Sequence, residues 1–109
     1  MSERKPKAVR LALESYGYQR LLNCGEDTSA LHSGMVCLDP GKSIGNHSTN
    51  DGEEVIIVLN GEGEMSFDDY ETLKMAEDFL IYCPSHTEHD VKNTGNETLK
   101  YVFVVAKVS

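Results

Sequence analysis

The sequence of 109 residues lacks the features of several large classes of protein. Its longest apolar runs, VIIVL and VFVVA, are far too short to cross a bilayer. The first residues, MSERKPKAVRLALESYG, contain no apolar core of the length that a secretory signal needs. From the sequence we therefore expect a cytoplasmic location and no membrane partner.

Paired cysteines are also missing. The three cysteines, Cys24, Cys37 and Cys83, are an odd and widely spaced set without a CxxC pair. Such a set makes neither a disulfide framework nor a thiolate zinc site. We interpret them as buried or half-buried reduced thiols, which fits a cytoplasmic protein.

An excess of positive charge is absent as well. Eighteen acidic residues against ten basic ones give a formal net charge of −8. This balance argues against the phosphate backbone of a nucleic acid, or an anionic membrane surface, as a partner. The basic residues near the start are too few and too mixed to change that conclusion: Arg4, Lys5, Lys7 and Arg10.

Patterns typical of helices are scarce, whereas one stretch, EVIIVLNG at residues 54–61, strongly predicts a strand. Strict alternation places Glu54, Ile56 and Val58 on one face. Val55, Ile57 and Leu59 fall on the other face. Both faces are apolar beyond the glutamate, so we expect both to be covered.

Further short strands are predicted over 30–38, 61–75 (a hairpin) and 77–83, and residues 94–108 are predicted as a turn followed by a last strand. Residues 18–23 are another short candidate, and residues 42–52 are predicted as a polar loop. Residues 8–14 are compatible with helix or strand, and the alternation of Val9, Leu11 and Leu13 favours strand. Strands of about six residues with turns every 8–12 residues indicate a single all-β domain, a sandwich or barrel.

Four histidines are the strongest candidates for chemistry: His32, His47, His86 and His89. Taken singly, each is compatible with an ordinary surface residue. Their arrangement is more specific, because His47 lies in the loop before the strand that Glu54 begins. His89 follows a second strand, which Pro84 terminates.

These residues carry a resemblance to the cupin family. That family's first motif is a glycine, five residues, His-x-His, three or four residues, a glutamate, six residues and a glycine. Gly41, His47, Glu54 and Gly61 stand at these spacings, but Thr49 takes the place of the second histidine. The resemblance covers about residues 31–106, with residues 1–30 as N-terminal strands or an arm. It implies a small double-stranded antiparallel β-barrel of the jelly-roll type.

The second motif of the family ends in Pro-x-Gly, two residues, a histidine, three residues and an asparagine. Pro84, His89 and Asn93 match it, whereas His86 stands where glycine is usual. Ahead of Pro84, Glu77 and Asp78 replace the usual Gly-Asp, with one residue more than the pattern.

In cupins the histidines and glutamate of the two motifs bind a divalent metal, and the resemblance transfers this role to His47, Glu54 and His89. Thr49 and His86 are candidates for further contacts to an ion such as Fe, Mn, Ni or Zn. Two imidazoles and a carboxylate suit non-haem Fe(II). The resemblance thus implies a metal-dependent enzyme, such as an oxygenase, acting on a small organic molecule. The alternative is a binding or sensing module without turnover, in which these side chains line a metal-free pocket.

Other residues leave alternatives open. His32 is pocket lining or an exposed residue, and Glu88 and Asp90 are surface charges unless one of them orients the His89 imidazole. The strands containing VIIVL and YVFVV are apolar on both faces, although a small barrel has only one interior. A second copy of the chain is the economical cover for the outer faces, so we expect a homodimer.

Overall fold

The computed structural model describes residues 4–14 and 17–108, and in these residues every regular element is a β-strand. The strands are β1 (Gly17–Leu22), β2 (Leu31–Leu38), β3 (His47–Ser48), β4 (Gly52–Asn60), β5 (Glu62–Phe67), β6 (Leu73–Ala76), β7 (Leu80–Cys83), β8 (Glu88–Asn93) and β9 (Leu99–Lys107). The predicted all-β class is confirmed. No helix able to span a membrane occurs in the described part of the chain.

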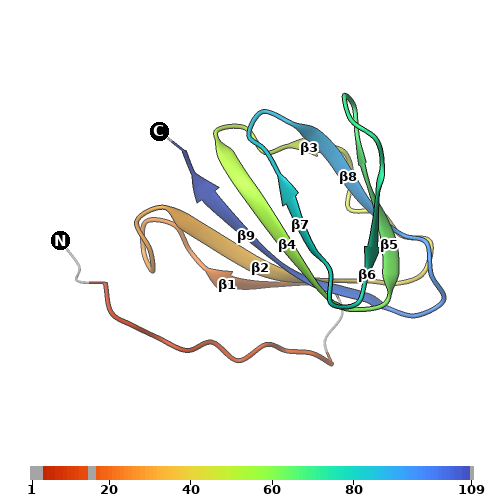
Figure 1. The fold of residues 1–109 in the computed structure, drawn as a ribbon. Coiled ribbons are helices and arrows are strands. Elements are labelled where there is room, and N and C mark those ends of the chain that lie inside the picture. The colour runs from red at the N-terminus through yellow and green to blue at the C-terminus, as the bar shows by residue number, and fades with distance from the viewer. Residues whose placement is uncertain (1–3, 15–16, 109) are drawn as a thin grey trace.

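The strands form two antiparallel sheets that face each other (Figure 1). One sheet has the order β1-β2-β9-β4-β7 and the other has the order β3-β8-β5-β6. This is the expected jelly-roll arrangement, although hydrogen bonds between the described strands do not join the sheets into a closed barrel.

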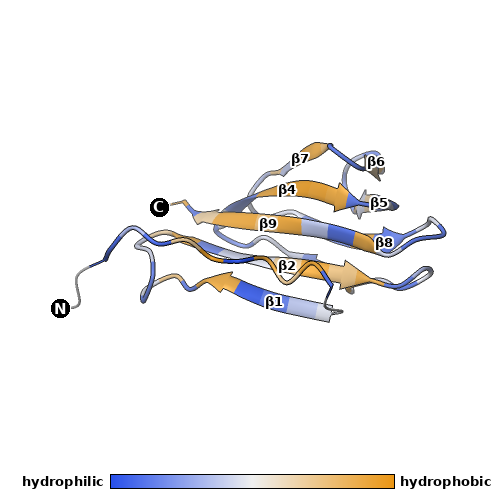
Figure 2. Ribbon diagram, turned by 90° about the horizontal axis from the view of Figure 1, so that it is seen from below, coloured by the Kyte–Doolittle hydropathy of each residue, from blue (hydrophilic) through white to orange (hydrophobic). Residues whose placement is uncertain are grey.

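The core lies between the two sheets and is built by alternation along the strands. On β4, Ile56 and Val58 are buried on the inner face, as expected, whereas Ile57 on the outer face is exposed, so within one chain the expected cover of both faces is not found. Figure 2 shows that β4 and β9 are hydrophobic over most of their length. The rest of the buried cluster comes from both sheets: Met65, Met75, Ile81, Cys83, Val91, Leu99 and Tyr101.

The prediction of a strand over residues 8–14 is wrong. Residues 4–12 have no regular secondary structure and run along the outer side of β1 and β2 (Figures 1 and 2). The Gln19 side chain provides the hydrogen bonds that a neighbouring strand would have supplied, accepting one from the Ala12 amide and donating one to the Arg10 carbonyl. The alternation of apolar residues therefore does not correspond to strand pairing, and Val9 and Leu13 remain exposed on the arm.

This N-terminal arm covers part of the outer face of the five-stranded sheet, over β1 and β2. Met35 faces outward with its cross-strand neighbours Gln19 and Val102, yet it is only 1% exposed. Beyond the arm, the outer face of β4 and β7 stays open, with Ile57, Leu80 and Tyr82 all exposed.

We predict that this open face pairs with a second copy of the chain. Leu80→Glu, at the most exposed of its apolar side chains, should convert a dimer into a monomer because a charge would be buried in the interface. The measurement is light scattering after gel filtration at micromolar concentration. Leu73→Glu on β6, also exposed but in the other sheet, is the matched control and should remain dimeric. A monomeric wild type would contradict this prediction.

Candidate functional site

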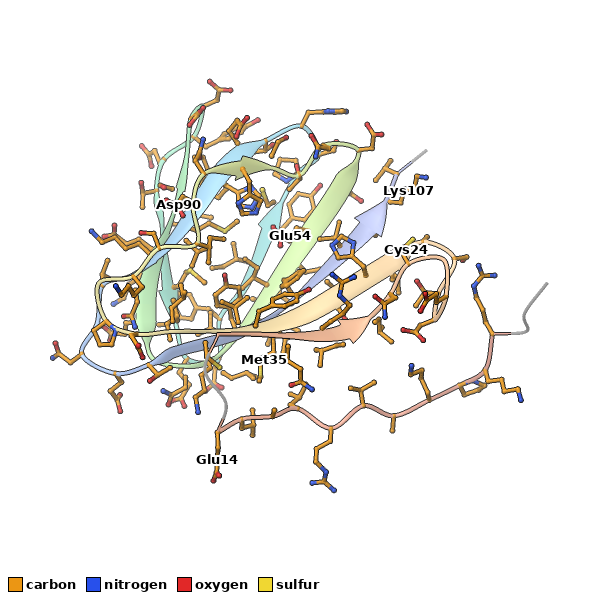
Figure 3. All side chains as sticks on the ribbon, turned by 180° about the vertical axis from the view of Figure 1, so that it is seen from behind. Glu14, Cys24, Met35, Glu54, Asp90 and Lys107 are labelled. Atoms are coloured by element: carbon orange, nitrogen blue, oxygen red, sulfur yellow. The ribbon has the colours of Figure 1, made fainter. Side chains whose placement is uncertain are left out.

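A cavity of about 380 Å³ lies between the sheets, and its lining includes His47, Glu54 and His89. The remaining lining is mainly apolar or aromatic: Gly17, Tyr18, Val36, Cys37, Leu38, Ile44, Ile56, Val91, Tyr101 and Phe103. The three residues that the motifs single out are therefore brought to one hollow. In Figure 3, Glu54 lies on β4 within the space between the sheets.

Strand pairing brings the two histidines together. Residues 42–52, which the sequence predicts as a loop, contain the two-residue strand β3, which pairs with β8 so that His47 lies directly opposite His89. The centroids of the two imidazole rings are 4.2 Å apart. Glu54 reaches the same cavity from the opposite sheet, because it is on the inward face of β4.

Glu54 and His89 form a buried contact of ionisable groups. Their side chains are almost completely enclosed, and His89 Nε2 lies 3.1 Å from Glu54 Oε1. Burial by itself would lower the pKa of His89, but the Glu54 carboxylate and the Thr87 carbonyl outweigh it and raise this pKa above its ordinary value. The site therefore favours a positive charge beside the carboxylate.

Backbone carbonyls orient both imidazoles. His89 Nδ1 lies 3.0 Å from the Thr87 carbonyl oxygen, and His47 Nδ1 lies 2.9 Å from that of Gly45. Since a carbonyl only accepts, we assign the proton of each neutral ring to Nδ1, which leaves a lone pair on each Nε2. Glu54 Oε1 is buried and has no hydrogen-bond partner among the described residues.

Two lone-pair atoms, His89 Nε2 and Glu54 Oε1, thus face each other at 3.1 Å in a buried place. Such a pair is unfavourable unless a proton or a metal cation lies with it. Imidazole nitrogens and a carboxylate oxygen are suitable ligands for a divalent ion, but the positions of these side chains fit such an ion only in part. Within residues 4–14 and 17–108, no three His, Cys, Asp or Glu side chains are already grouped so that they could hold a metal ion.

The two further candidates, Thr49 and His86, are not part of the cavity lining. The Thr49 hydroxyl donates to the Pro84 carbonyl at 2.7 Å and accepts from the Thr87 amide at 3.1 Å. This hydroxyl therefore connects the loop before β4 to the loop before β8. His86 is exposed, and its Nε2 lies 3.6 Å from Asp51 Oδ1.

Glu88 and Asp90 hold the His47 loop instead of contacting the His89 ring. Asp90 Oδ1 accepts from the Gly45 amide at 3.0 Å, and Glu88 Oε2 accepts from Asn46 Nδ2 at 3.3 Å. Both contacts stabilise the turn immediately before His47. They bridge residues more than forty positions apart in the sequence, so no local pattern revealed them.

Several lining residues escaped the sequence analysis. Tyr18 and Phe103 stack with ring centroids 6.1 Å apart, and Ile44 comes from the polar loop before β3. Cys83 is not part of the lining, but its Sγ lies 3.8 Å from His89 Nδ1, and burial, followed by the nearby Glu54 charge, raises the pKa of this thiol to about 11. The thiol is therefore neutral at physiological pH. The alternation along β1 and β9 could have identified Tyr18 and Phe103 as cavity-lining residues only if the strand order had been known.

Comparison with known families and structures agrees with this architecture. Residues 34–105 match the model of the cupin domain. No curated protein matches the chain by sequence.

Solved structures resemble the chain in fold. The cupin domain of Cnp3 from Schizosaccharomyces pombe has a TM-score of 0.73 at 18% identity, and the match covers 83% of this chain but 59% of that one. A cupin 2 conserved barrel domain protein from Salinispora arenicola has a TM-score of 0.75 at 19% identity, covering 95% and 91% of the two chains. A predicted oxalate decarboxylase from Thermotoga maritima has a TM-score of 0.68 at 20% identity, covering 93% and 100%.

Proposed function

The chain belongs to the cupin family, and on that premise we propose that it binds a small organic molecule in the cavity, beside a divalent metal ion that His47, Glu54 and His89 hold. Members of this family commonly bind a metal. The cavity volume of about 380 Å³ suits a small ligand, and its apolar walls with a few polar groups are typical of such sites.

One observation carries the proposal: Glu54 Oε1 is buried 3.1 Å from His89 Nε2, and when His89 is neutral with its proton on Nδ1, this oxygen has no hydrogen-bond donor among the described residues. A buried, unsatisfied carboxylate oxygen costs free energy, which a bound cation would recover. The carbonyls at Nδ1 of both histidines are the contacts that metal-binding imidazoles commonly make. Since the three donors do not yet surround one point, the exposed His47 side chain has to adjust on binding.

His47, Glu54 and His89 would hold an Fe(II) ion, which would supply the activation of dioxygen beside an organic substrate. The apolar walls would orient the body of the substrate and exclude water from its reacting end. Tyr101 is buried, and burial raises the pKa of its phenol, so its hydroxyl remains protonated in the cavity. These properties favour an oxygenase-type enzyme, and the similarity in fold to the predicted oxalate decarboxylase from Thermotoga maritima supports a catalytic role.

The experiment is metal binding by protein purified without chelators. We expect about one divalent ion per chain by elemental analysis, and a stoichiometric titration of stripped protein with Co²⁺ or Mn²⁺. His47→Ala and His89→Ala should each lower the affinity at least a hundredfold, because each removes one of three ligands.

His86→Ala is the matched control, since it removes an exposed imidazole that lies outside the cavity lining. It should bind the ion as the wild type does. Equal metal content in the wild type and in both cavity-histidine variants would contradict the proposed site.

The second candidate function is a binding module without metal or turnover. It is favoured by the finding that no three ligating side chains are pre-arranged in the described part of the chain. In that case a proton on His89 would neutralise Glu54, as the raised pKa of this histidine allows. A stripped protein that binds its small molecule equally well with and without added metal would identify this alternative.

A further inference from the structure

The inner face of the five-stranded sheet continues beyond the cavity toward β1. Cross-strand partners lie on the same face of a sheet. One row across β4, β9 and β2 consists of Glu54, Val105 and His32. The next row consists of Ile56, Phe103, Gly34 and Arg20. Arg20 and His32 therefore share the face of Glu54, two to three strands away from it.

A second hollow of about 300 Å³ lies at this end of the face. Its lining is Tyr18, Arg20, Leu22, Asn23, Cys24 and His32. Tyr18 lines both hollows, so they are neighbours separated by one ring. Phe103 stacks on Tyr18 and meets the His32 ring edge-on, with centroids 5.9 Å apart. An aromatic floor thus connects the two hollows.

Gly34 leaves the space that the Tyr18 and Phe103 rings of this floor occupy. A Cβ atom at position 34 would lie 2.7 Å from the Tyr18 ring and 2.8 Å from the Phe103 ring. Only a glycine leaves room for both rings to lie over β2. The two rings that lie between the hollows are therefore packed directly on the sheet.

The second hollow carries positive charge in an acidic chain. No Asp or Glu belongs to its lining, whereas the Arg20 guanidinium does, and the net charge of the chain is −8. Arg20 Nη1 donates to Asn23 Oδ1 at 2.9 Å, and no ion pair with a described residue neutralises it. The nearby Asp27 is already paired with Lys7 at 2.9 Å, which lowers the pKa of that carboxyl group.

We propose that Arg20, assisted by His32, binds the carboxylate of the small molecule whose other end lies at Glu54 and His89. This inference deepens the proposed function by naming the ligand class: a small organic acid with an apolar body. Strands in a sheet are about 4.8 Å apart, so along the sheet His32 on β2 lies about 10 Å, and Arg20 on β1 about 14 Å, from Glu54. A guanidinium fork matches a carboxylate, and a single full positive charge suits a monoanion.

The test uses calorimetry with a series of probes: octanoate, octan-1-ol, octylamine and octyl phosphate. The wild type should bind octanoate at least tenfold more tightly than octan-1-ol, because the guanidinium adds a charge-assisted hydrogen bond. Arg20→Gln should lose this preference and keep the affinity for octan-1-ol. Arg10→Gln, which makes the same change of charge on the arm, is the matched control and should behave as the wild type.

The outcomes separate this inference from the proposed metal site when each titration is run with stripped protein and with Mn²⁺. Octanoate preference that depends on Arg20 without any metal binding supports the inference while the metal proposal fails. Metal binding with equal affinity for octanoate in the wild type and Arg20→Gln overturns the inference alone. Tighter binding of octylamine or octyl phosphate than of octanoate, or no binding of carboxylates of four to ten carbons, also overturns it.

Discussion

Glu54→Gln is expected to lower the affinity for a divalent ion about a hundredfold or more while leaving the metal-free protein folded. The amide keeps the size of the side chain but removes the negative charge and one strong ligand. Loss of an outer contact to a metal ligand commonly costs up to a hundredfold, so loss of a direct ligand should cost at least as much. Titration of stripped protein with Mn²⁺ measures this.

The stability of the same variant provides the second readout. Without metal and at a pH at which His89 is neutral, Glu54 Oε1 is a buried oxygen that lacks a hydrogen-bond donor, so a neutral amide should keep the free energy of unfolding within about 1 kcal/mol of the wild type. A residue that only supported the fold would behave differently, losing stability and metal together. Unchanged metal affinity in Glu54→Gln would mean that the Glu54 carboxylate does not bind the ion.

Asn93→Ala is expected to produce the largest loss of stability, about 3 kcal/mol in the free energy of unfolding. The side chain is fully buried and donates to the carbonyls of Leu38 and Glu97 at 2.9 and 2.8 Å. Its oxygen accepts from the Gly95 amide at 2.9 Å. Alanine leaves these three backbone groups without their partner, at a cost of about 1 kcal/mol each.

Urea denaturation measures this loss, with Asn96→Ala as the control. Asn96 is an exposed asparagine in the same turn, so its replacement should change the free energy of unfolding by no more than about 0.5 kcal/mol. A loss below about 1 kcal/mol in Asn93→Ala would mean that water replaces the three contacts. Metal affinity should be unchanged, because Asn93 is not part of the cavity lining.

Motif spacing and alternation predicted much of this molecule. The alternation over β4 correctly placed Glu54, Ile56 and Val58 inside, because a strand buried on one side has a strict period of two. The spacing of the two motifs predicted that His47 and His89 share one site. Both line the cavity, and they are direct partners in the β3–β8 ladder. Asn93 was recognised as a motif position, but its role appears only from its three backbone contacts.

The features that the sequence did not reveal depend on register and strand order. Arg20 and His32 join the inner face only because β1 and β2 add to the sheet beside β9. The arm resembles a strand in sequence, but its contacts include the hydrogen bonds of Gln19 to Arg10 and Ala12, and the alternating Val9 and Leu13 are exposed. Thr49 looks like a lost ligand in the motif, whereas its hydroxyl joins two loops. Long-range contacts of this kind leave no local pattern.

The most direct test of the metal site is anomalous diffraction from crystals of the wild type soaked in MnCl₂. We predict one strong peak in the cavity, with Nε2 of His47, Nε2 of His89 and a carboxylate oxygen of Glu54 within about 2.0–2.3 Å of it. A cavity without a peak, or manganese bound only at the exposed His86 and Asp51, would contradict the account.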